Sequence, residues 1–162
     1  MTITATKTAA ALLSAGDKAP AFDMAASDGK RATLADLKGK HVVLYFYPKD
    51  DTPGCTIEAK DFRDLLGDFT KAGAVIIGVS KDSLKSHEKF KEKYCLPFLL
   101  ATDEDGSVCE AYGVWVEKSM YGKKYMGIQR DTFLIDGSGT IKKVWRKVSV
   151  EGHAKEVLAA IA

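Results

Sequence analysis

The stretch between residues 41 and 79 limits the fold more than any other part of the chain, because two apolar runs lie on either side of a helical pattern. His41 to Tyr47 is a continuous run rich in β-branched and aromatic residues, typical of a strand buried on both faces of a sheet. Ala74 to Val79 is a second run of this kind. Between them, apolar residues recur at helical spacing from about Cys55 to Phe69, which predicts one helix. A right-handed crossover would make the two strands parallel, so the unit is β-α-β and the fold class is α/β.

The remaining pattern predicts a mixed central β-sheet flanked by helices. Ser27-Asp28-Gly29 is typical of a short hairpin connection. Further along, the pattern predicts helices over Ser83 to Tyr94 and His153 to Ile161, a helical turn over Val108 to Tyr112, and strands over Leu99 to Thr102, Arg130 to Ile135 and Thr140 to Trp145. A parallel unit followed by a hairpin and a final helix gives an α/β sandwich.

The length of 162 residues predicts one domain, since domains usually hold roughly 100 to 200 residues. Residues 1–16 are rich in Thr and Ala and show no turn-and-strand pattern, so we expect a flexible N-terminal arm before a single domain at 17–162. With 46% hydrophobic residues, that domain can bury a core without disulfides, a structural metal or an obligatory partner. We therefore expect a monomer.

Charge and hydropathy argue against two classes of partner. The formal net charge is +2, too small for a nucleic-acid or membrane-surface footprint. No apolar run approaches the roughly 18 residues of a membrane helix, and Met1 to Ala19 lacks the pattern of a secretory signal. We expect a soluble protein of the cytoplasm that binds no nucleic acid and no membrane.

The three cysteines do not form a recognisable disulfide or redox pair. Cys55, Cys95 and Cys109 are an odd number, and their separations of 40 and 14 positions exclude a C-x-x-C motif. The three histidines are also widely spaced, and none forms a zinc-ligand motif with a cysteine or with another histidine. We expect no metal site.

The loop before the predicted helix, from Pro48 to Cys55, carries the residues most suited to chemistry. Cys55 stands at the start of the helix, where free amide donors and the positive end of the helix dipole favour a thiolate. Gly54 lets the backbone approach a small ligand closely, and the hydroxyl of Thr52 can both donate and accept a hydrogen bond. Taken alone, this pattern is equally compatible with a buried structural cysteine.

A longer match favours the reactive interpretation. The spacing P-x-x-x-T-x-x-C at Pro48, Thr52 and Cys55 resembles the signature of the peroxiredoxins, and residues 45–56 resemble the bacterioferritin comigratory protein (PrxQ) branch. The likeness continues through residues 80–83, 103–105, 127–130 and 132–136, so it covers nearly the whole chain from Gly16 onward. It implies a thioredoxin-like fold and thiol-dependent reduction of hydrogen peroxide and organic hydroperoxides, with no metal or organic cofactor.

The resemblance also implies roles for individual residues. Cys55 matches the peroxidatic cysteine, which is oxidised to a sulfenic acid, and Thr52 matches the threonine that positions the peroxide. Pro48 matches a proline that shields the pocket. Arg130 matches the arginine that holds the sulfur and peroxide oxygens, and Glu58 matches the acid that orients this arginine. A fixed guanidinium beside sulfur would stabilise the negative charge before and during attack.

The chain departs from the family at the resolving cysteine. Lys60 and Lys91 stand at the two positions where branch members carry it. Neither Cys95 nor Cys109 matches a resolving position, although either could still serve as one. The more economical cycle uses one cysteine, with a thioredoxin or glutaredoxin-type protein as the external thiol donor.

Other functions fit the sequence less well. A thioredoxin-like disulfide oxidoreductase needs a second cysteine where Glu58 stands, and a cysteine phosphatase needs an arginine where Asp61 stands. A cysteine hydrolase needs a histidine base, which the sequence does not place near Cys55. A non-enzymatic binding module on the same fold remains open as an alternative.

Overall fold

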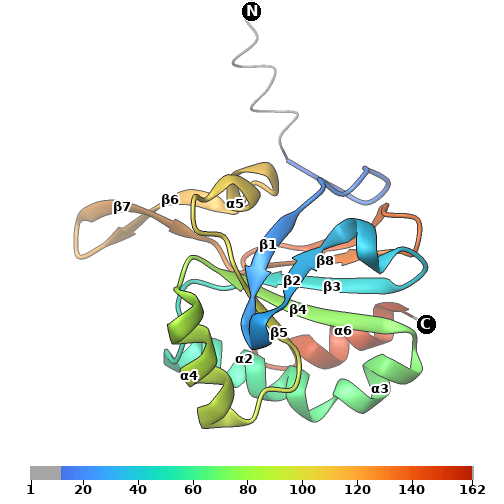
Figure 1. Ribbon diagram of the computed structural model, residues 1–162. Helices are drawn as coiled ribbons and strands as arrows, with labels where there is room; N and C mark the ends of the chain where they lie inside the picture. Colours follow the sequence, from blue (N-terminus) through green and yellow to red (C-terminus); the bar gives the residue numbers. More distant parts are fainter. Residues whose placement is uncertain (1–11, 162) are drawn as a thin grey trace, which may run out of the picture.

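A seven-stranded sheet forms the centre of the protein, in the strand order β2-β1-β5-β4-β3-β8-β9 (Figure 1). The computed structural model describes residues 12–161. Its strands are β1 (Asp23–Ala26), β2 (Arg31–Thr33), β3 (His41–Phe46), β4 (Ala74–Ser80), β5 (Leu99–Thr102), β6 (Trp115–Met120), β7 (Lys123–Ile128), β8 (Asp131–Ile135) and β9 (Ile141–Trp145). Its helices are η1 (Ser27–Gly29), η2 (Leu34–Leu37), α2 (Pro53–Asp64), α3 (Leu66–Lys71), α4 (Leu84–Tyr94), α5 (Ser107–Ala111) and α6 (His153–Ile161).

The predicted β-α-β unit is confirmed. Strand β3 pairs in parallel with β4, and β4 pairs in parallel with β5. On its other side β3 pairs antiparallel with β8, which continues into the hairpin with β9. The sheet is therefore mixed, as the sequence predicts, and the fully buried β3 lies near its middle.

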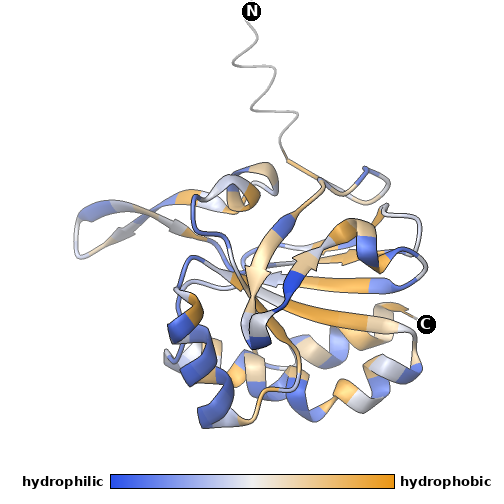
Figure 2. Cartoon of the chain, in the orientation of Figure 1, coloured by the Kyte–Doolittle hydropathy of each residue, from blue (hydrophilic) through white to orange (hydrophobic). Residues whose placement is uncertain are grey.

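The sheet has a hydrophobic core on each face. Side chains alternate along β3, so Val42, Leu44 and Phe46 belong to one core while Val43 and Tyr45 belong to the other. The second core also holds buried residues of α2, α3, α4 and α6, which all cover the same face of the sheet. Figure 2 shows the apolar strands above these helices and the hydrophilic surface of α4.

The single helix predicted from Cys55 to Phe69 is wrong, because the chain forms two helices. Leu65 leaves the helical conformation, with φ −103° and ψ 4°, and separates α2 from α3. A straight helix would carry Phe62 and Phe69 about two turns apart. The break instead lets Phe69 fold back, so that the two buried rings lie 5.8 Å apart between centroids.

The β6–β7 hairpin is an element that the sequence analysis did not predict. It projects from the body of the protein, at the left of Figure 1. Tyr121 and Gly122 form its turn, and both have positive φ values, 53° and 77°, as a type I′ hairpin turn requires. The other predicted elements are confirmed with shifts of one or two residues at their ends.

Most of the predicted N-terminal arm, residues 1–11, lies outside the described residues. Gly16, the last residue of the predicted arm, contacts β9, since its amide donates to the Ile141 carbonyl at 2.8 Å. Lys18, just after the arm, forms an isolated antiparallel β-bridge with Thr140. Within residues 12–161, no helix combines the length and the apolar character that crossing a membrane would need.

Candidate functional site

Cys55 is the third residue of α2 and its side chain is buried, with 1% of its surface exposed. Pro53 occupies the first helical position, where the missing N–H is not needed. The first intrahelical bond runs from the Thr56 amide to the Thr52 carbonyl at 2.8 Å. The amides of Gly54 and Cys55 precede that bond, so the positive end of the helix faces the thiol.

Arg130 reaches this helix start from the beginning of β8, the strand that pairs with β3. In the antiparallel pair, Phe46 at the end of β3 lies opposite Asp131 at the start of β8. Arg130 therefore lies beside the point where β3 gives way to the β3–α2 loop. Its Nη2 lies 3.0 Å from the position that a Cβ on Gly54 would occupy. A side chain at this position would crowd the guanidinium, and glycine leaves it the most room beside Cys55.

Glu58 lies one helical turn after Cys55 and holds Arg130 in this position. Arg130 Nη1 donates to Glu58 Oε1 at 2.8 Å, and the Glu58 side chain is 1% exposed. Burial raises the pKa of Glu58 to about 7, against the lowering effect of Arg130. Burial alone would lower the pKa of Arg130, but the Glu58 carboxylate and the Cys55 sulfur raise it above its usual value. The guanidinium therefore stays charged beside Cys55.

Thr52 and Pro48 lie on the β3–α2 loop, residues 47–52. The Thr52 hydroxyl donates to the Lys49 carbonyl at 2.8 Å, and its oxygen remains free to accept a bond from a ligand. Pro48 is exposed near the start of the loop. The structure thus gathers Cys55, Gly54, Glu58 and Arg130 in one group, with Thr52 three residues before the cysteine.

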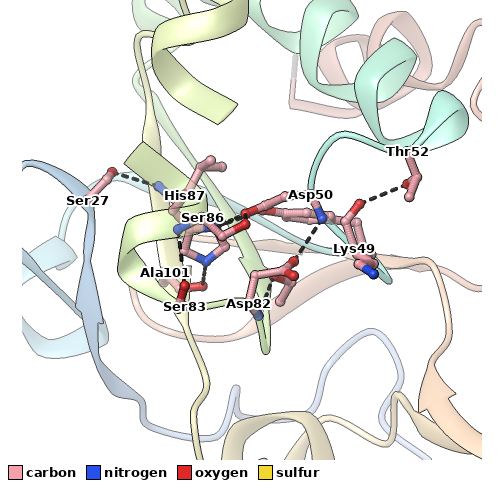
Figure 3. A network of polar contacts seen from close by, with 12 residues as sticks. Ser27, Lys49, Asp50, Thr52, Asp82, Ser83, Ser86, His87 and Ala101 are labelled. Carbon is pink, nitrogen blue, oxygen red and sulfur yellow. Dashed lines mark hydrogen bonds and ion pairs between the residues drawn. The ribbon is translucent and has the colours of Figure 1, made fainter. Parts of the chain in front are cut away.

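Asp50 fixes the same loop through a polar network that the sequence analysis missed (Figure 3). Its Oδ2 lies 2.7 Å from Nδ1 of His87 and accepts from the Ser86 hydroxyl at 2.8 Å, so α4 holds the loop from one side. Its amide donates to Asp82 Oδ2 at 2.8 Å. His87 is fully buried, and its Nε2 lies 3.1 Å from the Ala101 carbonyl oxygen.

The Asp50, Asp82 and His87 side chains could in principle hold a metal ion, since their candidate ligand atoms lie within 4.8 Å of one another. Each of these atoms already has a protein partner. The Ser80 hydroxyl and the Asp50 amide both donate to Asp82 Oδ2. We interpret the cluster as a support for the loop, because its hydrogen bonds are complete without an ion.

Lys118 on β6 brings a second cation toward the site. Its Cδ lies 3.3 Å from the position of a Cβ on Gly127, so the stem runs across the opposite strand of the hairpin. Burial lowers the pKa of Lys118 and Arg130 lowers it further, while Cys55 and Asp131 raise it. Lys118 thus lies within electrostatic reach of Cys55. Lys118 was not predicted as a site residue, because no pattern indicated the strand that carries it.

The other two cysteines lie in different surroundings. Cys109 is buried in α5, and burial together with the nearby Asp103 carboxylate raises its pKa far above the usual value, so it stays a thiol. Cys95 is exposed and caps the end of α4 in the left-handed conformation, with φ 54°. Neither is positioned at the helix start with Cys55.

Comparison with known proteins gives one family model, one group of relatives and one group of solved structures that agree with one another. A model of the AhpC/TSA family matches residues 15–144. The chain is 53% identical to peroxiredoxin Bcp of Bacillus subtilis over 146 residues. This match covers 90% of this chain and 93% of the relative. Peroxiredoxin Q of Xanthomonas campestris superposes with a TM-score of 0.83 at 50% identity, covering 86% of this chain and 89% of that chain.

Two further structures of the Xanthomonas campestris protein carry single cysteine-to-serine substitutions. The two substituted cysteines lie 36 positions apart in that protein. In this chain the same separation leads from Cys55 to Lys91.

Proposed function

Since the chain belongs to the AhpC/TSA family and is a peroxiredoxin, an enzyme that reduces peroxides with a thiol, we propose that Cys55 is the thiol that reacts. The fold is thioredoxin-like, in agreement with the expectation from sequence. The observation that carries the proposal is the approach of Arg130 to Gly54, which sets a guanidinium beside a cysteine at a helix start. Both features favour the thiolate over the thiol.

In the oxidation step, the Cys55 thiolate attacks one oxygen of the peroxide. A sulfur–oxygen bond forms while the oxygen–oxygen bond breaks, so sulfur is oxidised to a sulfenic acid and the second oxygen leaves as water or an alcohol after taking a proton. Arg130 stabilises the negative charge that moves from sulfur to the leaving oxygen. Thr52 accepts a hydrogen bond from the peroxide and orients it for attack.

Supporting residues keep this arrangement fixed. Glu58 holds the guanidinium through the 2.8 Å bond to Oε1. Gly54 gives the guanidinium its space, and Pro48 shields the pocket at the start of the loop. These roles follow the match to the family, and the contacts of Glu58 and Gly54 with Arg130 support them.

We further propose that an external thiol reduces the sulfenic acid, supplied by a thioredoxin or glutaredoxin-type protein. Cys109 is buried as an unreactive thiol and Cys95 is exposed at the end of another helix, which supports a cycle without an internal partner. The physiological form would be a monomer in the cytoplasm, with one domain over residues 17–162. The three free cysteines fit a reducing compartment.

Peroxide consumption with purified protein tests the proposal. With thioredoxin and its reductase as electron donors, the wild-type chain should consume hydrogen peroxide catalytically. One equivalent of peroxide without a donor should leave a trappable sulfenic acid on Cys55, identified by mass spectrometry. Oxidation at Cys95 or Cys109 with Cys55 left reduced would refute the assignment.

A further inference from the structure

Helix α4 carries a lysine where the Xanthomonas campestris relative carries one of its two substituted cysteines, and this lysine is unusually well anchored. Lys91 Nζ donates to the Phe98 carbonyl at 2.7 Å and pairs with Asp28 Oδ2 at 3.1 Å. Its side chain is only 10% exposed. Removing a nearly buried ammonium from these partners would leave polar groups without bonds, so the contacts resist opening.

The partners of Lys91 lie on two other segments of the fold. Asp28 belongs to η1, and Phe98 directly precedes β5. A second bond joins the same segments, since the Asp28 amide donates to Glu88 Oε2 at 2.9 Å. Helix α4 is thus tied along its middle to the edge of the sheet.

Other contacts tie the helix to the β3–α2 loop. Ser86 and His87 bind Asp50, as described above. Near the other end of the helix, Lys93 and the Tyr94 hydroxyl bind the Asp51 carboxylate at 2.8 Å and 2.9 Å. The contacts with Asp51 are exposed and contribute little, so Lys91 makes the least exposed charged contacts in the second half of the helix.

These ties determine where Cys95 lies. Arg63 Nη1 donates to the Tyr94 carbonyl at 2.9 Å, which sets the end of α4 beside the eighth residue after Cys55 on α2. Cys55 lies about two helical turns before Arg63 and is buried, whereas Cys95 is exposed, and a disulfide needs Cα atoms within about 7 Å. Cys95 can reach Cys55 only if the end of α4 unwinds.

We propose that Lys91 is a positioning residue that locks α4 in its folded form during the catalytic cycle, so that Cys95 cannot resolve the Cys55 sulfenic acid. The proposal rests on the function proposed above and explains why that function needs an external thiol. Without the contacts of Lys91, the end of α4 would unwind and the Cys95 thiol would attack the sulfenic sulfur. A disulfide would form, and the sulfenic oxygen would leave as water with the thiol proton.

The test compares Lys91→Ala with Lys89→Ala, a matched control on the exposed side of the same helix. Alanine is the best helix former, so neither change weakens α4 through propensity. After one equivalent of hydrogen peroxide, non-reducing digestion and mass spectrometry should find a Cys55–Cys95 disulfide in Lys91→Ala. The wild type and Lys89→Ala should instead show a trapped sulfenic acid on Cys55.

Hydrogen exchange gives a second readout. In Lys91→Ala, amides at the end of α4 should exchange about tenfold faster or more, the usual effect of losing a charge-assisted hydrogen bond. Lys91→Arg should restore slow exchange, because it keeps the charge. If Lys91→Ala does not fold, Lys91→Met is used in both measurements in its place, because methionine keeps the apolar stem of the side chain.

The outcomes separate the two proposals. A Cys55–Cys95 disulfide in the wild type would overturn the role proposed for Lys91 while leaving peroxidase function intact. The absence of this disulfide in folded Lys91→Ala or Lys91→Met would do the same. Absence of any Cys55 oxidation in all variants would instead overturn the function proposed for Cys55. In Lys91→Ala with Cys95→Ser, the sulfenic acid should return, which identifies the partner.

Discussion

The three cysteines differ in reactivity because of their surroundings. Only Cys55 combines a helix start with a guanidinium at close range. Cys55→Ser should therefore abolish peroxide turnover, while Cys109→Ser should leave it nearly unchanged. Peroxide consumption measures both effects, and circular dichroism checks that each variant is folded. Turnover retained without the Cys55 thiol would contradict the assignment.

Removal of the Arg130 guanidinium should slow oxidation strongly. Arg130→Ala should lower the second-order rate constant with hydrogen peroxide by about two orders of magnitude, the scale of losing one preorganised donor. Arg31→Ala is a suitable control, since this arginine forms an exposed pair with Asp23 on the first hairpin. Stopped-flow fluorescence gives the rates. Equal rates for the two variants would show that Arg130 does not act on the peroxide.

Glu58 should make stability depend on pH. Its pKa is about 7 in the folded protein against 4.5 for the free side chain, so the folded state binds the proton more tightly. The contribution of this group is present below about pH 4.5 and is lost as pH rises through about 7, with a total of roughly 3 kcal/mol. Glu58→Gln should flatten this fall in the free energy of unfolding, measured in urea at several pH values. An unchanged slope would refute the prediction.

The sequence reveals some of the site residues and not others, for a physical reason. Cys55, Gly54 and Thr52 are neighbours in the chain, so the loop pattern alone indicates them. Arg130 lies 72 positions after Glu58, and only the family resemblance connects them. Asp50 and His87 were missed because their contact depends on how α4 packs against the loop, which local spacing does not report.

At the scale of elements, two glycines should respond oppositely to alanine. A Cβ on Gly78 in β4 would lie 2.9 Å from the Tyr45 ring and 3.0 Å from Leu100, both buried, so Gly78→Ala should destabilise by about 1 to 3 kcal/mol. Gly67 lies in α3 with nothing within 4 Å, and Gly67→Ala should stabilise by about 0.5 to 1 kcal/mol. Urea denaturation measures both. A stabilised Gly78 variant would mean that the core adapts more freely than its packing indicates.

The elements that sequence predicts well are those whose burial leaves a strong pattern. Strands β3 and β4 are apolar over most of their length because both faces are covered, so their runs are plain in the sequence. The β6–β7 hairpin has mostly exposed or half-buried residues and no core of its own, and it leaves no such pattern. The break at Leu65 depends on how Phe69 meets Phe62, which is tertiary packing rather than propensity.

At the scale of the whole molecule, two cores share one sheet, so we expect them to unfold together. Trp115 packs against one core and Trp145 against the other. Trp115→Phe and Trp145→Phe each leave a single fluorescent reporter, one for each face. Both variants should give urea transitions that coincide with their far-ultraviolet circular dichroism. A reporter that changes at a different urea concentration would show that one face opens independently.

The pairing of β3 with β8 also determines when the protein acquires its chemistry. Arg130 follows Cys55 by 75 residues, and the two groups come together only after β8 has joined the sheet. A chain is synthesised from its N-terminus, so Cys55 leaves the ribosome well before Arg130 exists. A nascent chain therefore carries a cysteine without its guanidinium. The arrangement of charge around Cys55 is therefore complete only when synthesis of the chain is nearly finished.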